Sequence, residues 1–137
     1  MRVFVDANVP MYAAGRNHPF KDPSADFMMA VGRRRVDAVS DVEVLQEILH
    51  RYRAVGRATD GSVVFEGFAT AVRLFHPIVL EDLWECRRIL ARHETLRPRD
   101  AIHVAVMRRT GIRTIVSYDR HFDELPGIDR VTPDAVP

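Results

Sequence analysis

The hydrophobic and polar positions along the chain follow two alternating patterns. Short runs of β-branched and aromatic residues predict buried strands, and longer stretches with apolar residues at helical spacing separate them. We expect strands over residues 3–5, 36–40, 76–80 and 114–117, and an extended piece at a sheet edge over 129–132. We expect helices over 9–14, 22–35, 41–55 and 59–75, two more that open at Glu81 and Pro98, and one helical turn over 120–125.

The starts of several helices are predicted from capping residues. Ser40 and Glu43 are spaced as a capping box, in which the Ser side chain bonds the start of the helix and the Glu side chain reaches back. Asp22 followed by Pro23 is typical of an N-cap and a first helical residue. Asn8 suits the N-cap of the first helix.

The alternation of strands and helices predicts the fold class. We expect a three-layer α/β/α fold with a mainly parallel central sheet of four to five strands and helices on both of its faces. A chain of 137 residues can bury one core without disulfides, so we expect a single domain over residues 1–137.

Composition excludes several other classes of protein. One cysteine, Cys86, excludes an intrachain disulfide and a cysteine-based zinc site. No signal-peptide pattern and no run of the ~18 apolar residues that a membrane span needs is present, so we expect a cytoplasmic protein with no membrane contact. Of the 20 basic residues, all but Lys21 are Arg. An Arg-rich surface fits a nucleic-acid partner, although a genomic bias toward Arg explains the composition equally well.

Four acidic residues fall where a parallel sheet collects its functional groups. Asp6 and Asp119 follow two strands, and Glu47 and Asp100 lie in the opening turns of helices. Ligands in open α/β sheets bind beyond the carboxyl ends of the strands, so all four can meet above one edge. Four such carboxylates repel unless a cation neutralises them, and oxygen ligands indicate Mg²⁺ or Mn²⁺.

Two residues near this edge have a simpler interpretation. An isolated Asp after a strand often only caps a turn, and Asp6 alone fits that role. His103 lies three residues after Asp100 on the same helical face, so the two can chelate a metal. A His between Ile102 and Val104 is more often a packed, hydrogen-bonded residue, and we favour that interpretation.

Four segments along the chain form a recognisable series. They are Asp6-x-Asn8 after the first strand, Ser40 with Glu47 seven residues later, Arg99-Asp100-Ala101-Ile102-His103-Val104-Ala105, and Ser117-Tyr118-Asp119-x-x-Phe122-Asp123. With these segments the chain resembles PIN-domain ribonucleases of the VapC toxin type. Each motif is weak alone, but together they follow the order of the family over nearly the whole chain. One departure is Ser117, where Thr is frequent in the family, and the hydroxyl is retained.

The resemblance implies a PIN-like fold and metal-dependent cleavage of RNA. It assigns metal-binding roles to the acids Asp6, Glu47, Asp100 and Asp119, with Asp123 as a fifth. For a toxin it also implies inhibition by a small antitoxin and assembly as a homodimer. We hypothesise that the acids hold one or two ions that activate water for in-line attack on phosphorus, while Asn8 and Ser117 position carboxylates or water.

Two rival functions remain open at this stage. A catalytically silent RNA-binding or antitoxin-docking module on the same fold would not need a repulsive acidic cluster. A phosphotransfer receiver domain also gathers carboxylates around Mg²⁺, but it needs a Lys late in the chain. This sequence has no Lys after Lys21.

Overall fold

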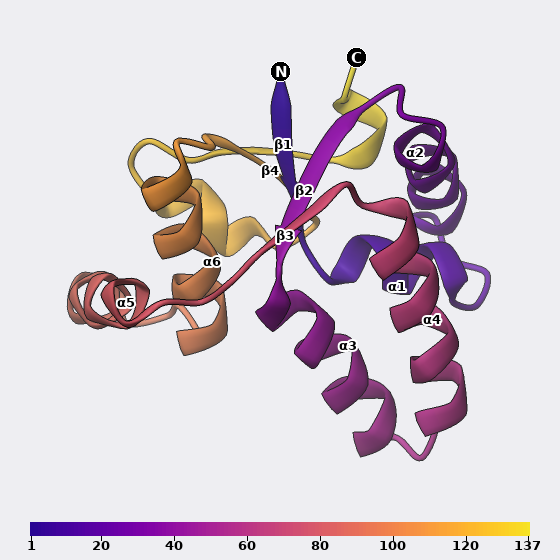
Figure 1. Cartoon of the computed structure of the whole chain (residues 1–137), viewed down its shortest axis with the longest axis horizontal. Coiled ribbons are helices and arrows are strands. Elements are labelled where there is room, and N and C mark those ends of the chain that lie inside the picture. The colour runs from indigo at the N-terminus through magenta and orange to yellow at the C-terminus, as the bar shows by residue number, and fades with distance from the viewer.

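One parallel sheet runs through the middle of the molecule. The computed structural model describes residues 1–137 and is shown in Figure 1. Its strands are β1 (Arg2–Val5), β2 (Asp37–Asp41), β3 (Leu74–His76), β4 (Thr114–Val116) and β5 (Asp129–Val131). The strand order is β3-β2-β1-β4-β5, and each neighbouring pair is parallel. The predicted parallel sheet of four to five strands is confirmed.

Six helices cover the sheet on both sides. They are α1 (Asn8–Ala14), α2 (Lys21–Gly32), α3 (Val42–Ala54), α4 (Ala58–Ala71), α5 (Leu80–Arg92) and α6 (Pro98–Thr110). Short 3-10 helices follow at η1 (Arg120–Glu124) and η2 (Pro133–Ala135). Figure 1 shows α5 and α6 on one side of the sheet and α1, α2 and α4 on the other, which confirms the predicted three-layer α/β/α fold. No helix is long and apolar enough to cross a membrane.

The central strand β1 anchors the core. Its residues Val3, Phe4 and Val5 are fully buried, because helices cover both faces of the strand. They belong to one cluster of 28 buried apolar side chains that joins the two helical layers. Burial of each of these side chains stabilises the folded state by roughly 1.5–3 kcal/mol. Strand β1 is therefore firmly packed, and so is the carboxyl edge of the sheet where it ends.

The predicted capping box at the start of α3 is wrong. Strand β2 continues through Asp41, and the side chain of Asp41 is the N-cap, accepting a hydrogen bond from Val44 N at 3.0 Å. Ser40 is buried within the sheet and donates to the carbonyl of Val5 at 2.9 Å. Glu43 pairs instead with Arg99 of α6 at 3.3 Å. Because β2 pairs with β1, the N-cap of α3 is Asp41, one residue later than the predicted Ser40.

Two other predicted boundaries are also wrong. Helix α2 begins at Lys21 and its N-cap is Phe20, with no side-chain cap, so Asp22 lies inside the first turn. The strand predicted over 76–80 lies earlier, since β3 ends at His76 and α5 begins at Leu80. Strand β2 sets this position, because Ser40 is paired with Phe75 in the sheet.

Helices α5 and α6 are fastened by one buried acid. Asp82 accepts two hydrogen bonds from Arg109, at 2.8 and 3.0 Å, and one from the backbone of Val79 at 2.9 Å. Burial alone would raise the pKa of Asp82, but the bonds from Arg109 and Val79 outweigh it and hold that pKa below its usual value. Asp82 is therefore a structural acid that ties α5 to α6.

Candidate active site

Asp6 lies at the carboxyl end of the central strand and is fixed by a network of hydrogen bonds. Its Oδ1 accepts from Ala7 N at 2.8 Å, and its Oδ2 accepts from Ser117 Oγ at 2.6 Å and Asn8 Nδ2 at 3.2 Å. Ser117 is fully buried at the end of β4, the neighbour of β1. Adjacent parallel strands thus bring residues 111 positions apart into direct contact.

Asn8 acts as a bridge at this edge and is not the N-cap that we predicted. The N-cap of α1 is Ala7, and Asn8 is the first helical residue. The Asn8 amide donates to both Asp6 and Ser117, while its Oδ1 accepts from Tyr118 N at 3.3 Å. Ser117 Oγ also accepts from Asp119 N at 3.0 Å. Both supporting residues named from the sequence therefore contact the carboxylate-bearing residues of the edge.

Glu47 and His103 approach Asp6 from two helices. Glu47 is on α3 and His103 on α6, and both are buried. Donor atoms of Asp6, Glu47 and His103 all lie within 4.8 Å of one another. The ring of His103 is packed and hydrogen-bonded, as favoured from the sequence, with Nδ1 2.7 Å from Asp41 Oδ2. Its Nε2 is 3.8 Å from Glu47 Oε1, which is too long for a hydrogen bond.

Asp100 experiences the charges of the whole cluster. Burial and then the negative charges of Asp6, Asp119 and Glu47 outweigh the opposing charge of His103 and raise the pKa of Asp100 to about 6. Burial likewise raises the pKa of Asp6. Burial would also raise the pKa of Glu47, but the neighbouring His103 and Arg99 keep it below its usual value. Acids from β1, α3, α6 and the end of β4 therefore share one electrostatic site.

The imidazole of His103 lies among these carboxylates, and their negative charges act on it. Burial would lower the pKa of this imidazole, but Asp41, Glu47 and Asp6 outweigh burial and raise the pKa well above its usual value. The surrounding carboxylates therefore favour the protonated form of this imidazole.

The remaining two predicted acids are placed differently. Asp119 is half-buried at the start of η1, where its Oδ1 accepts from His121 N and lies 2.9 Å from the ring nitrogen of the same residue. Asp123 is half-exposed, and Arg130 binds both of its carboxylate oxygens, at 2.8 and 3.1 Å. The carboxylate of Asp123 is therefore engaged by an Arg. The charge of Asp119 acts on Asp100, but neither residue belongs to the group of Asp6, Glu47 and His103 whose ligand atoms lie within 4.8 Å of one another.

The donor set at this edge fits a divalent cation. Glu47 Oε1, Asp100 Oδ2 and His103 Nε2 are buried and have no hydrogen-bond partner. Buried polar atoms normally have partners, and exceptions need a physical explanation such as a bound ion. A divalent cation would both satisfy these atoms and neutralise the carboxylates, which a neutral ligand would not.

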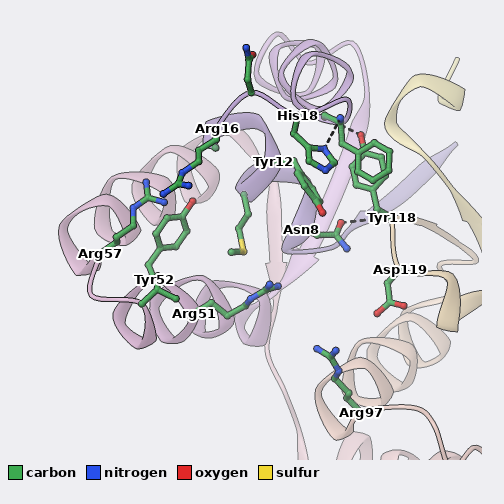
Figure 2. Close-up of a pocket in the computed structure, with 15 residues that line it drawn as sticks. Asn8, Tyr12, Arg16, His18, Arg51, Tyr52, Arg57, Arg97, Tyr118 and Asp119 are labelled. Carbon is green, nitrogen blue, oxygen red and sulfur yellow. Dashed lines mark hydrogen bonds between the residues drawn. The ribbon is translucent and has the colours of Figure 1, made fainter.

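A cavity of about 690 Å³ opens beside the acids. Figure 2 shows Asp119 and Arg97 at one end of this cavity and Tyr52 and Arg57 at the other. Its lining also includes Asn8, Arg16 and Arg51. Four guanidinium groups and a carboxylate of the acidic site thus border the same hollow.

An aromatic cluster also lines the cavity, and it was not predicted from the sequence. Tyr118 stacks on Phe20 with ring centres 4.0 Å apart and an interplanar angle of 7°. Tyr12 lies edge-on to both rings at 5.3 Å, and His18 packs against Tyr12 at 4.8 Å. Phe20 and Tyr118 are 98 residues apart, so no local pattern could have predicted their contact.

Comparison with known proteins agrees with this architecture. The PIN domain family model matches residues 3–128. Ribonuclease VapC13 of Mycobacterium tuberculosis is 39% identical over 129 residues, which cover 94% of this chain and 98% of the relative.

Two solved structures share the fold. VapBC2 from Rickettsia felis, bound to a DNA fragment from its promoter, superposes with a TM-score of 0.74 at 13% identity, over 96% of this chain and 98% of the other. A toxin-antitoxin complex from Klebsiella pneumoniae gives a TM-score of 0.65 at 14% identity, over 96% and 97% of the two chains. The chain therefore belongs to the PIN domain family, among the VapC ribonucleases.

Proposed function

We propose that this chain is a divalent-cation-dependent endoribonuclease and the toxin of a toxin–antitoxin pair. The observation that carries the proposal is a buried site at the end of β1, where ligand atoms of Asp6, Glu47 and His103 lie within 4.8 Å of one another. The charges of Asp100 and Asp119 act on the same site, and two buried carboxylate oxygens there lack partners. The names of the curated relatives supply the substrate class, RNA. A catalytically silent binding module is not favoured, because a repulsive buried cluster serves no purpose in it.

The acids Asp6, Glu47, Asp100 and Asp119 would hold Mg²⁺ or Mn²⁺. Asp123 remains a predicted fifth ligand, which would have to leave Arg130 to bind. When bound, such an ion activates water and stabilises charge on the phosphate and the leaving oxygen.

The other residues of the site serve to fix the carboxylates. The Ser117 hydroxyl donates a hydrogen bond to Asp6 Oδ2 and accepts hydrogen bonds from the Asn8 amide and from the backbone N–H of Asp119. These three bonds keep the hydroxyl from rotating freely. Because Ala7 N also donates to Oδ1, both Asp6 oxygens are held before substrate arrives. Such pre-organisation lowers the reorganisation needed during catalysis.

The cavity beside the acids suits a single RNA strand. Arg guanidinium groups bind phosphate oxygens through paired hydrogen bonds, and aromatic faces stack on unpaired bases. We propose that Arg97 and Arg51 contact phosphates near the scissile bond, and that one base lies against Tyr12 and His18. A strand in this position would pass directly over Asp119.

Cleavage of a mixed cellular RNA pool tests the nuclease assignment. The wild type should give discrete products with Mg²⁺ or Mn²⁺ and none with EDTA, and Asp6→Asn should give none under any condition. Asp129→Asn is the matched control, because it makes the same change at an exposed acid at the opposite, amino end of a strand. If the folded wild type, free of co-purified inhibitor, cleaves nothing, or if Asp6→Asn remains active, the proposal fails.

Salt-dependent RNA binding tests the proposed path of the strand. In the inactive Asp6→Asn background, each phosphate contact that is removed should lower the slope of log affinity against log salt by about 0.7. Arg97→Ala and Arg51→Ala should each show this change, measured by the fluorescence anisotropy of a labelled single strand. Arg73→Ala is the control, since Arg73 is exposed and lies outside the cavity. Equal slopes in all variants would exclude this path.

We also propose an antitoxin partner, a homodimer and a cytoplasmic location. The toxin-antitoxin title of the Klebsiella structure supports the partner. Helix α5 leaves Leu80, Leu83 and Trp84 exposed, with Leu80 70% accessible, and exposed apolar side chains that cluster often mark contact surfaces. Light scattering on the purified chain should give twice its 15.7 kDa mass, and a monomeric mass at micromolar concentration would refute the dimer.

A further inference from the structure

We propose that the cation site of this chain includes a nitrogen ligand, Nε2 of His103, held in place by Asp41. The inference rests on the proposed cation site and goes beyond it, because it changes the chemical class of metal that the site prefers. A site of carboxylates and water suits Mg²⁺ and Mn²⁺, whereas an added imidazole strengthens the binding of transition-metal ions over Mg²⁺, least for Mn²⁺ and more for Co²⁺.

The Asp41–His103 pair has the arrangement that orients a histidine for metal binding. Both side chains are fully inaccessible, and Nδ1 lies 2.7 Å from Asp41 Oδ2. The other oxygen of Asp41 caps α3 by accepting from Val44 N, so helix α3 fixes the carboxylate. A metal-bound His almost always donates its second ring N–H to a carboxylate or carbonyl in this way. With Nδ1 as the donor, the lone pair of Nε2 is available to a cation.

The second ring nitrogen of His103, Nε2, lies on the side of the acidic site. Nε2 is buried without a hydrogen-bond partner, as is the nearby Glu47 Oε1, and these two atoms are 3.8 Å apart. Ligand atoms bound about 2.0–2.2 Å from one ion lie roughly 3–4 Å from each other. The distance from Nε2 to Glu47 Oε1 falls within that range. One ligand atom from each of Asp6, Glu47 and His103 lies within 4.8 Å of the other two.

An alternative role for His103 is that of a permanent imidazolium that neutralises Asp41 and Glu47. In that case Nε2–H should donate to Glu47, yet the distance of 3.8 Å is too long for that bond. With a dication bound by Asp6 and Glu47, the metal would supply that positive charge. A neutral His103 would donate Nδ1–H to Asp41 and leave the lone pair of Nε2 free.

Pulsed electron paramagnetic resonance of the Mn²⁺-loaded full-length wild type tests the proposal directly. A nitrogen ligand gives ¹⁴N coupling to the Mn²⁺ spin, and this coupling should change to ¹⁵N when the protein is made with ¹⁵N-labelled histidine. Bound Mn²⁺ with no nitrogen coupling would overturn the role of His103 and leave the proposed nuclease intact. Failure to bind Mn²⁺ at all would count against both.

Matched variants extend the test to metal preference. Calorimetry should show that His103→Asn weakens Mn²⁺ and Co²⁺ binding by at least about 10-fold and Mg²⁺ binding much less, and Asp41→Asn should weaken Mn²⁺ binding by about 10–100-fold. His76→Asn is the control, because its Nε2 is also buried without a partner but lies near Arg109 and Arg2.

The outcomes of this comparison are unambiguous. Folding of each variant is checked by circular dichroism before titration. Unchanged Mn²⁺ affinity in folded His103→Asn would overturn the proposal, and if that variant does not fold, the resonance measurement on the wild type decides.

Discussion

The packing of α4 against α3 depends on Gly61 and allows a matched pair of substitutions. A Cβ added at Gly61 would lie 2.6 Å from Cβ and 3.1 Å from Cγ of Tyr52, so an Ala there forces the helices apart. Gly67 lies in the same helix, and a Cβ added there meets nothing within 4 Å. The two substitutions change the same atoms in the same helix and differ in the contact with Tyr52.

The magnitudes follow from two opposing effects. Replacing Gly by Ala within a helix stabilises it by up to about 1 kcal/mol, whereas forcing extra methyl volume into a packed contact costs about 1–3 kcal/mol. Gly67→Ala should therefore raise the free energy of unfolding by up to ~1 kcal/mol. Gly61→Ala should lower it by up to ~2 kcal/mol, because the clash offsets the gain in helix propensity.

Urea unfolding followed by circular dichroism measures both changes against the wild type. Subtracting one variant from the other removes the shared propensity effect and leaves the contact, about 1–3 kcal/mol. Equal stabilisation by both substitutions would refute the close approach of the two helices. It would also remove the support for the position of Tyr52, which lines the cavity and lies 5.4 Å below the guanidinium of Arg57.

Three further predictions concern the Asp82–Arg109 ion pair, the hydroxyl of Ser117 and the acids of the proposed cation site. Asp82→Asn should lower the free energy of unfolding by about 1.5–3 kcal/mol at pH 7 and make that free energy less sensitive to acid. The reason is that the wild type loses this stabilisation as the pH falls below the usual carboxyl range through the depressed pKa of Asp82. Urea titrations from pH 7 to about 2.5 measure the effect, and parallel profiles of wild type and variant would contradict it. Ser117→Ala should lower RNA cleavage and cation affinity by about 10–100-fold while Ser117→Thr retains most of both, measured by gel assay and calorimetry; equal loss in the two would show that the hydroxyl is not the cause. Saturating Mg²⁺ or Mn²⁺ at about 100 times the dissociation constant should stabilise the wild type by ~2.7 kcal/mol and leave Asp6→Asn nearly unchanged in thermal unfolding; an equal shift in both would place the ion elsewhere.

The sequence predicts the sheet and the convergence of acids because both follow from short local patterns. An apolar β-branched run such as Val3–Val5 predicts a buried strand, and parallel pairing places the residue after it at a common edge. Asp6 and Asp119 follow two strands in this way, and the charges of both raise the pKa of Asp100. The type and order of the elements were therefore predictable from the sequence alone.

The details that the sequence did not predict depend on partners far along the chain. Ser40 and Asp41 are both good capping residues, and pairing of β2 with β1 decided between them. Asn8 has the composition of a cap, but its bonds go to Ser117 and Tyr118, more than 100 residues away. No local rule predicts such contacts, because they arise only when β4 pairs with β1.

The position of β1 also determines when the active site can exist. This strand precedes β4 by more than 100 residues along the chain, yet the two pair in the finished sheet, and Ser117 follows Asp6 by 111 residues. At ribosomal rates of about 5–20 residues per second, roughly 5–20 seconds separate the synthesis of these two partners. Throughout that interval the carboxylate of Asp6 lacks both its hydroxyl donor and the strand that positions Asp119. A nascent chain that has not yet reached β4 therefore carries no assembled acidic site.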